Sequence, residues 1–102
     1  MTTLVVLFNL KPEASASEYE HWAKTTDLPI VRELTSVDSF DAFKTQGVLG
    51  SDNPAPYEYV EVIHVNDMAT FGTEVATDTM RKVAGEFQQF ADGPVFMVTE
   101  AL

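Results

Sequence analysis

The residues best suited to chemistry lie on one strand-like segment, residues 57–65, whose sequence is YEYVEVIHV. Side chains alternate between the two faces of a strand, so Tyr57, Tyr59 and Glu61 are expected to point the same way. A carboxyl group in a semi-enclosed cavity has a raised pKa, which suits a general acid or base near neutral pH. Val60 and Val62, on the other face, suit packing against helices. This segment predicts either a lined cavity with Glu61 as the proton-transfer group or an exposed glutamate on a strand edge.

Four further candidates accompany Glu61. Tyr59 and Tyr57 would donate hydrogen bonds to a carbonyl or enolate oxygen or stack on a flat ring, unless they serve ordinary packing. Asn9, on an otherwise apolar strand, either orients a ligand or is a polar strand end. His64 falls on the strand face opposite Glu61 and is a second acid/base candidate, with a structural role as the alternative.

The remaining candidates belong to the first predicted helix and the residues after it. Trp22 is the only tryptophan and is either a core residue or a cavity wall. Asp27 lines the mouth of the cavity or stabilises a break in the helix, and Arg32 pairs with Asp27 or with a substrate carboxylate. No phosphate-binding loop, zinc-protease motif or nucleophile elbow is present. The sequence therefore predicts no metal site and no cofactor.

The elements that position these residues follow one another in the order β-α-β-β-α-β. Strands are predicted over 4–10, 37–45, 57–65 and 95–99. A helix with capping-box spacing opens at Ser17, and residues 27–29 are expected to interrupt it because proline disfavours a helical residue before it. Asp67 and Asp78 are expected to cap the later helical segments. Residues 92–94 are expected to turn the chain into the last strand.

This element order indicates an α+β protein of the ferredoxin-like arrangement, with a four-stranded antiparallel sheet and helices on one face. Residues 1–102 are expected to form one domain. The first strand is apolar on both faces, so both faces should be covered, and the helices can cover only one of them. A second copy of the sheet is the simplest cover for the other face, which predicts a homodimer.

Charge and composition exclude several classes of function. The net charge is −10, with 16 acidic and 6 basic residues, which argues against binding nucleic acid or anionic membranes. The absence of cysteine rules out disulfides, thiolate catalysis and zinc-thiolate sites. No apolar run is long enough to span a bilayer, and the N-terminus lacks the positive region of a signal peptide, so a cytoplasmic protein is expected.

Several motifs together resemble the dimeric α+β barrel superfamily, and within it the REDY-like HapK family of bacterial prodigiosin-type tripyrrole pigments. They are the start of the first strand at 3–8, Tyr19-x-x-Trp22, Asp27-Leu28-Pro29, and Tyr57-x-Tyr59-Val60-Glu61-Val62. The resemblance covers nearly the whole chain. It implies two sheets packed face to face in a homodimer, with ligand cavities between sheet and helices or inside the barrel.

Two functions of other superfamily members depend on histidines that this chain lacks at the corresponding positions. EthD-type relatives have His-x-Pro after the first helix, where this chain has Asp27-Leu28-Pro29, so the role of that histidine does not transfer. Heme-degrading relatives use a histidine on a helix, and the one helical histidine predicted here, His21, points outward. Heme ligation of that kind is not expected.

The resemblance implies a small homodimeric protein of secondary-metabolite biosynthesis that acts on an aromatic or pyrrolic intermediate. As an enzyme it would be a cofactor-independent cyclase, dehydratase or monooxygenase-like protein, in which Glu61 moves a proton and Tyr59 or Tyr57 holds an oxygen. The alternative is a protein without turnover that carries an intermediate or assists the pathway enzymes. Substitution of Glu61 by glutamine separates the two hypotheses.

Overall fold

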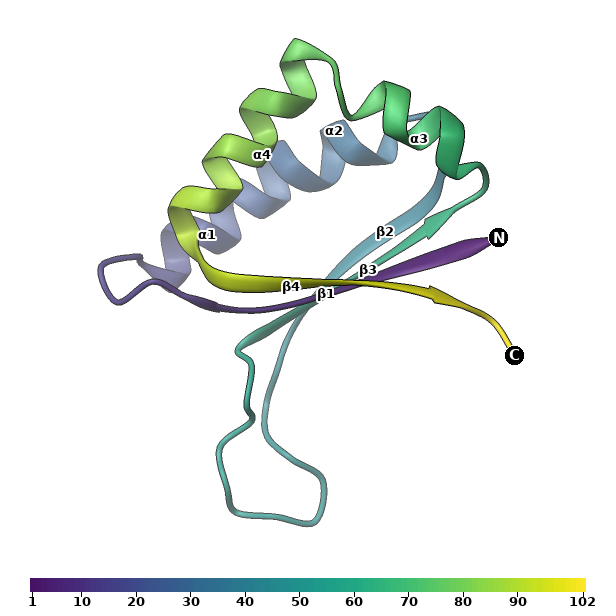
Figure 1. Cartoon of the computed structure of the whole chain (residues 1–102). Coiled ribbons are helices and arrows are strands. Elements are labelled where there is room, and N and C mark those ends of the chain that lie inside the picture. The colour runs from purple at the N-terminus through teal and green to yellow at the C-terminus, as the bar shows by residue number, and fades with distance from the viewer.

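A computed structural model describes all 102 residues and shows one four-stranded sheet covered by helices on one face (Figure 1). The elements are β1 (Thr2–Leu10), α1 (Ala16–Trp22), the π-helical segment η1 (Ala23–Asp27), α2 (Leu28–Arg32), β2 (Val37–Lys44), β3 (Tyr59–Val65), α3 (Met68–Glu74), α4 (Asp78–Phe90) and β4 (Ala91–Glu100). The strand order is β2-β3-β1-β4 and every neighbouring pair is antiparallel. The predicted ferredoxin-like fold is confirmed.

The two faces of β3 lie opposite to the way we expected. Tyr59, Glu61 and the residues at 63 and 65 are buried on the face that meets the helices. Val60 and Val62 instead lie on the open face, paired with Leu7 and Val5 of β1. The prediction that the two valines pack against the helices is therefore wrong. The larger side chains of β3 pack against the helices. The carboxyl group of Glu61, on the same face, accepts a hydrogen bond from Tyr19 of α1.

An aromatic cluster forms the core under α1 and α4. The ring of Phe8 is completely buried and lies 5.4 Å from Tyr19, 5.5 Å from Tyr59 and 5.0 Å from Phe87, measured between ring centroids. Burying a side chain of this size contributes about 1.5–3 kcal/mol. A second, mainly aliphatic cluster lies under α2 and consists of Val31, Val37, Phe40, Ile63, Val65 and Met80.

The first helix begins two residues earlier than the spacing at Ser17 predicts. The cap is Ser15, whose hydroxyl accepts a hydrogen bond from the backbone N–H of Glu18 at 3.3 Å. This cap has the same serine-to-glutamate spacing of three residues, shifted along the chain. The later caps are Asp67, as expected, and Thr77 in place of Asp78.

The helix is not interrupted at residues 27–29, so that prediction is also wrong. The chain widens into one π-helical turn, in which the N–H of Leu28 donates to the carbonyl of Ala23, and then continues as α2. Pro29 lies in the first turn of α2, a position that tolerates proline because its backbone nitrogen needs no hydrogen bond within the helix. Such π turns are often found at functional sites. The consequence here is that Asp27 stays on the helix and is buried.

Two segments at the ends of the sheet differ from the expected elements. Residues 92–94 belong to β4 and carry a bulge, with a register shift opposite Leu7 and Asn9 and a positive φ of 56° at Gly93. The loop from 45 to 58 projects away from the helical layer (Figure 1). Asn9 holds its base, since its side chain donates to the carbonyl of Pro56 and accepts from the N–H of Glu58. β3 therefore begins at Tyr59.

A carboxylate clamp joins α3 to the turn before β2. Glu74 accepts hydrogen bonds from the backbone N–H and the hydroxyl of both Thr35 and Ser36. The bonds from Ser36 are the main cause that lowers the pKa of Glu74 to about 2. The clamp therefore needs an ionised Glu74.

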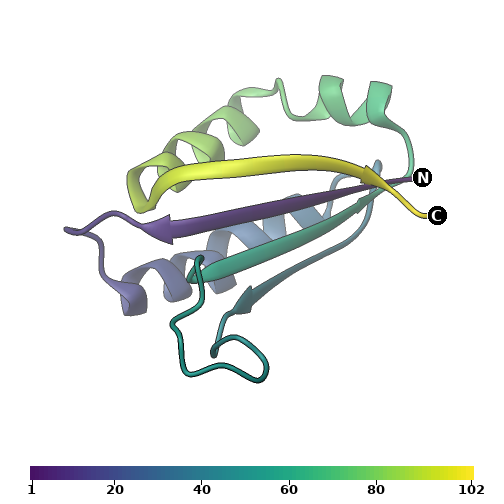
Figure 2. The same ribbon diagram turned by 60° about the horizontal axis from the view of Figure 1, so that its bottom comes forward.

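The sheet face opposite the helices is apolar and uncovered in a single chain (Figure 2). Its central side chains are partly or largely exposed: Val5, Leu7, Val60, Val62, Val95 and Met97. No helix of the structure has the length and apolar character needed to cross a membrane.

Candidate functional site

A cavity of about 140 Å³ lies between the sheet and the helices and holds two carboxyl groups, those of Asp27 and Glu61. We call it the acid cavity. Its walls are mostly apolar and come from all four strands and from α2, α3 and α4, with Val6, Val31, Phe40, Ile63, Met80 and Val83 among them. Two acids in such surroundings are unusual, because a buried charge is stable only when it is paired or hydrogen-bonded.

Glu61 projects from the middle of β3 and is only 4% exposed. Its Oε2 accepts a hydrogen bond from the hydroxyl of Tyr19 on α1, with an oxygen-to-oxygen distance of 3.3 Å. The pKa of Glu61 is raised to about 8, mainly by burial and also by the charge of Asp27, while the Tyr19 hydrogen bond acts to lower it. Glu61 thus takes up and releases a proton near neutral pH.

Asp27 ends the π-helical segment and is 6% exposed. Its carboxyl group has no hydrogen-bond partner in the protein, and burial alone raises its pKa to about 7. Every fully buried side-chain oxygen or nitrogen of the protein has a hydrogen-bond partner, so the unbonded Asp27 oxygens are open to the cavity. An acceptor left free in a cavity is available for a donor group of a ligand.

The two carboxyl groups titrate in the same pH range and repel each other when both are ionised. Between pH 7 and 8 the pair is expected to hold about one proton, which either carboxyl group can carry. One carboxyl group can then act as an acid and the other as a base, an arrangement found in enzymes that pair two carboxyls. The acid cavity can therefore move a proton between two positions of a bound molecule.

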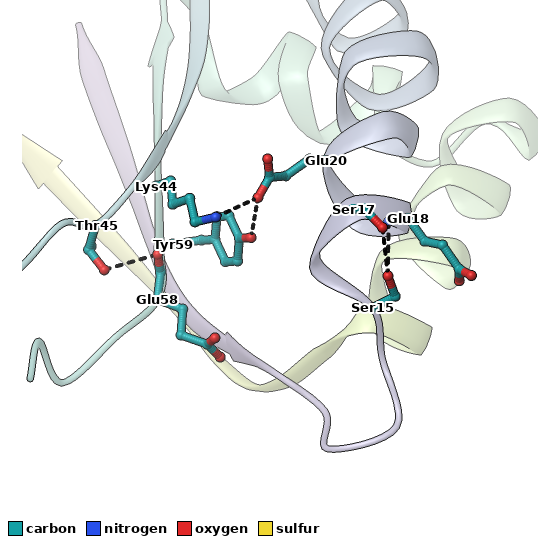
Figure 3. A network of polar contacts seen from close by, with 8 residues as sticks. All are labelled: Ser15, Ser17, Glu18, Glu20, Lys44, Thr45, Glu58 and Tyr59. Carbon is teal, nitrogen blue, oxygen red and sulfur yellow. Dashed lines mark hydrogen bonds and ion pairs between the residues drawn. The ribbon is translucent and has the colours of Figure 1, made fainter.

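A second pocket of about 260 Å³ adjoins the acid cavity, between α1–η1 and the strands β2 and β3. We call it the Glu20 pocket. The carboxylate of Glu20 accepts a hydrogen bond from the Tyr59 hydroxyl at 2.7 Å and forms an ion pair with Lys44 at 3.2 Å (Figure 3). Tyr19 lines this pocket while its hydroxyl bonds to Glu61, so its ring lies between the two spaces.

The structure brings only some of the predicted site residues together. Glu61 and Asp27 share the acid cavity, and Tyr59 shares the strand face with Glu61 but gives its hydroxyl to Glu20. Tyr57 precedes β3 and lines neither space. Trp22 packs on the aromatic cluster, where its indole N–H donates to Glu86 at 3.0 Å, and it lines neither space.

The other three candidates lie away from both spaces. The Arg32 guanidinium donates to the carbonyl of Phe40 and pairs with Asp41 at 3.3 Å, so the expected pairing with Asp27 is wrong. His64 is on the open face of the sheet, where its Nδ1 lies 3.0 Å from the hydroxyl of Thr3. Asn9 holds the base of the long loop, as described above.

Sequence reasoning did not single out Tyr19 and Glu20 as site residues. The helical spacing of Tyr19, Trp22, Ala23 and Thr26 predicts that Tyr19 lies on the inner face of the first helix, and this was the available signal. Nothing in the spacing connects it with Glu61, which is 42 residues further along the chain. Glu20 lies four residues before Lys24, a spacing that suits an exposed ion pair along a helix, but its ion pair is with Lys44 on β2.

Solved structures with the same fold include proteins of different described roles. A dimeric ferredoxin-like protein of unknown function from Thermobifida fusca is 13% identical, with 98% of this chain and 90% of that chain covered and a TM-score of 0.74. SnoaB, a cofactor-independent oxygenase from Streptomyces nogalater, is 13% identical, with 98% and 91% covered and a TM-score of 0.77. At these identities the likeness shows the fold alone. A comparison with curated proteins gave no match.

The family comparison is more specific. The profile of the family described as REDY-like protein HapK matches residues 2–102. The crystal structure of HapK from Hahella chejuensis is 30% identical over 100% of this chain and 93% of that chain, with a TM-score of 0.79. The match extends over both the acid cavity and the Glu20 pocket. This chain therefore belongs to the REDY-like HapK family.

Proposed function

We propose that the protein acts on a small, flat aromatic or pyrrolic intermediate of prodigiosin-like tripyrrole pigment biosynthesis, by acid/base chemistry without a cofactor. The observation that carries this proposal is the pair of buried carboxyl groups, Asp27 and Glu61, in an otherwise apolar cavity. Their pKa values of about 7 and about 8 bracket the range in which a proton is easily gained and lost. Apolar walls suit a flat ring.

The chemistry proposed for the pair is a proton shift. Ionised Asp27, which has no partner in the protein, accepts the proton of an N–H, O–H or acidic C–H group of the substrate. Protonated Glu61 gives its proton to a second substrate atom, or to a hydroxyl group that then leaves as water. Tyr19 holds Glu61 in place through the 3.3 Å hydrogen bond. A cyclisation, a dehydration or an isomerisation each needs only these two transfers.

The relatives support a role in small-molecule biosynthesis. The family match to HapK supports the assignment to pigment biosynthesis. SnoaB, described as a cofactor-independent oxygenase, shares the fold, so this fold is compatible with chemistry that needs no cofactor. Tyr59 keeps its proposed role of holding a substrate oxygen only for a ligand in the Glu20 pocket, where its hydroxyl lies.

A carrier or accessory protein is the second candidate. It is favoured by the composition of the acid cavity, in which 10 of the 13 lining residues are hydrophobic. Such a cavity can hold an apolar intermediate without changing it. In that case the free Asp27 acceptor fixes the orientation of the ligand through a hydrogen bond and no proton is transferred.

Incubation of the purified protein with a bipyrrole pathway intermediate, without added cofactor, tests the proposal. Substrate and product are followed together by mass spectrometry. Accelerated conversion supports the enzyme, and binding without conversion supports the carrier. The absence of both would contradict the assignment to this pathway.

We further propose a homodimer formed through the open sheet face. Replacing Val62 by aspartate puts a charge at the centre of that face and is expected to give a monomer, because burial of a charge is strongly unfavourable. Light scattering at micromolar concentration measures the mass, and circular dichroism checks the fold. Thr79→Asp, on the exposed surface of α4, is the matched control and should stay dimeric. A monomeric unmodified protein would rule out this interface.

A further inference from the structure

The Glu20 pocket concentrates positive charge in a strongly acidic protein. Lys24 and Lys44 both line it, and they are two of only six basic side chains in a chain of net charge −10. The overall field of such a chain repels anions, so an anionic ligand needs local cations where it binds. No basic residue lines the acid cavity, where Asp27 and Glu61 would repel an anion. The Glu20 pocket is therefore the better place for a negatively charged ligand.

A carboxylate of the protein already occupies the position where such an anion would lie. Glu20 accepts the Tyr59 hydroxyl at 2.7 Å and pairs with Lys44 at 3.2 Å (Figure 3). The Tyr59 hydrogen bond is the main cause that lowers the pKa of Glu20, so Glu20 is ionised. The Tyr59 ring is 3% exposed and fixed by its stack on Phe8, which makes its hydroxyl a preorganised donor. Glu20 itself sits on a partly exposed helix surface, from which its side chain can turn away.

We propose that the Glu20 pocket binds a small aromatic carboxylate, whose carboxylate group displaces Glu20 and is held by Lys44, Tyr59 and Lys24. The ring of the ligand would rest on the apolar lining from Tyr19, Ala23 and Leu28. The role that sequence reasoning gave to Arg32, recognition of a substrate carboxylate, thus passes to the two lysines, because Arg32 is paired with Asp41. This site is separate from the acid cavity and stands whether or not the proposed proton transfer occurs.

Binding of a matched pair of probes tests the inference. The probes are 2-naphthoate and the neutral 2-naphthamide, which share the same ring, and chemical-shift titration of the full-length protein locates where each one binds. Naphthoate is expected to bind about fivefold more tightly than naphthamide at low ionic strength, the upper range for one exposed ion pair. The difference should shrink at high ionic strength because salt screens the lysines. Equal affinities, or shifts confined to parts of the protein outside the α1–η1–α2 helix and strands β2 and β3, would overturn the proposal.

Substitutions at the two partners of the ion pair give effects of opposite sign. Lys44→Gln should weaken naphthoate binding about fivefold and leave naphthamide unchanged, because a cation that holds the ligand is lost. Glu20→Gln should strengthen naphthoate binding, because the competing carboxylate is removed. Lys82→Gln, on the exposed surface of α4, is the control and should change neither affinity. A purely structural ion pair predicts no such opposition, so two changes of the same sign would contradict the ligand site.

Discussion

Replacement of Glu61 by glutamine should lower the rate of product formation by at least about 100-fold while the protein still folds and binds its ligand. Glutamine keeps the shape of the side chain and can still accept the hydrogen bond from Tyr19, but it can neither take up nor release a proton. The expected loss is that of a general acid or base and not that of a binding group. Initial rates with a bipyrrole intermediate, followed by mass spectrometry, give the comparison.

Two further variants test whether the loss of activity is specific to the two buried carboxyl groups, Asp27 and Glu61. Asp27→Asn should cause a loss of similar size, because the proton shift needs both carboxyl groups. Glu13→Gln removes an exposed carboxylate outside both pockets and should leave the rate unchanged. A Glu61→Gln variant that converts substrate at the unmodified rate would exclude Glu61 as the acid or base. If only variants that fill the cavity reduce function, the carrier hypothesis gains support.

The order of the elements was predictable from the chain because the local patterns are strong. Four apolar segments with strand-like composition alternate with amphipathic stretches, and short connections leave few arrangements for them. The second strand was expected over 37–45 and is observed at Val37–Lys44. The sequence predicts a turn at Gly93, because glycine next to proline usually marks a change of direction. Only the pairing with β1 shows that the strand continues through a bulge there.

The orientation of β3 was not predictable in the same way. Alternation shows that Tyr59 and Glu61 share a face, and this is confirmed, but it does not show which face meets the helices. Hydrophobicity suggested the face with Val60 and Val62. The structure instead turns the face with Glu61 toward the helices, where Tyr19 supplies a hydrogen bond that sequence spacing cannot reveal.

The burial of Asp27 was not predictable from the sequence, for a local reason. The residues before Pro29 were expected to leave the helix, which would have placed Asp27 at a helix break at the mouth of the cavity. The π turn lets the chain pass the proline with helical geometry, and Asp27 is then directed into the interior. The pairing of the two acids therefore depends on one extra residue in a helical turn, a feature that hydrophobic periodicity does not detect.

The free energy of unfolding should fall by on the order of 4 to 8 kcal/mol as the pH rises from about 4.5 to 8, where the lower figure corresponds to one carboxyl group alone. Burial raises the pKa of Asp27 from 3.8 to about 7 and that of Glu61 from 4.5 to about 8. The folded state therefore binds more protons than the unfolded state in this range, and stability decreases with pH. Each unit of pKa shift corresponds to about 1.4 kcal/mol, and the two carboxyls titrate as a coupled pair, so their shifts do not simply add.

Glu74 gives the free energy of unfolding the opposite dependence on pH and so provides an internal control. Its pKa is lowered to about 2, so the stability that it contributes is present above about pH 4.5 and is lost as the pH falls toward 2. Urea unfolding at a series of pH values should thus show greatest stability near pH 4.5. The double variant Asp27→Asn, Glu61→Gln should remove the decline above pH 5 and keep the acidic one. Glu74→Gln should reduce only the acidic decline, to which Glu20 with its lowered pKa also contributes. A double variant that still loses stability between pH 5 and 8 would show that other groups bind the protons, and the acid cavity would then lose its physical basis as a proton-transfer site.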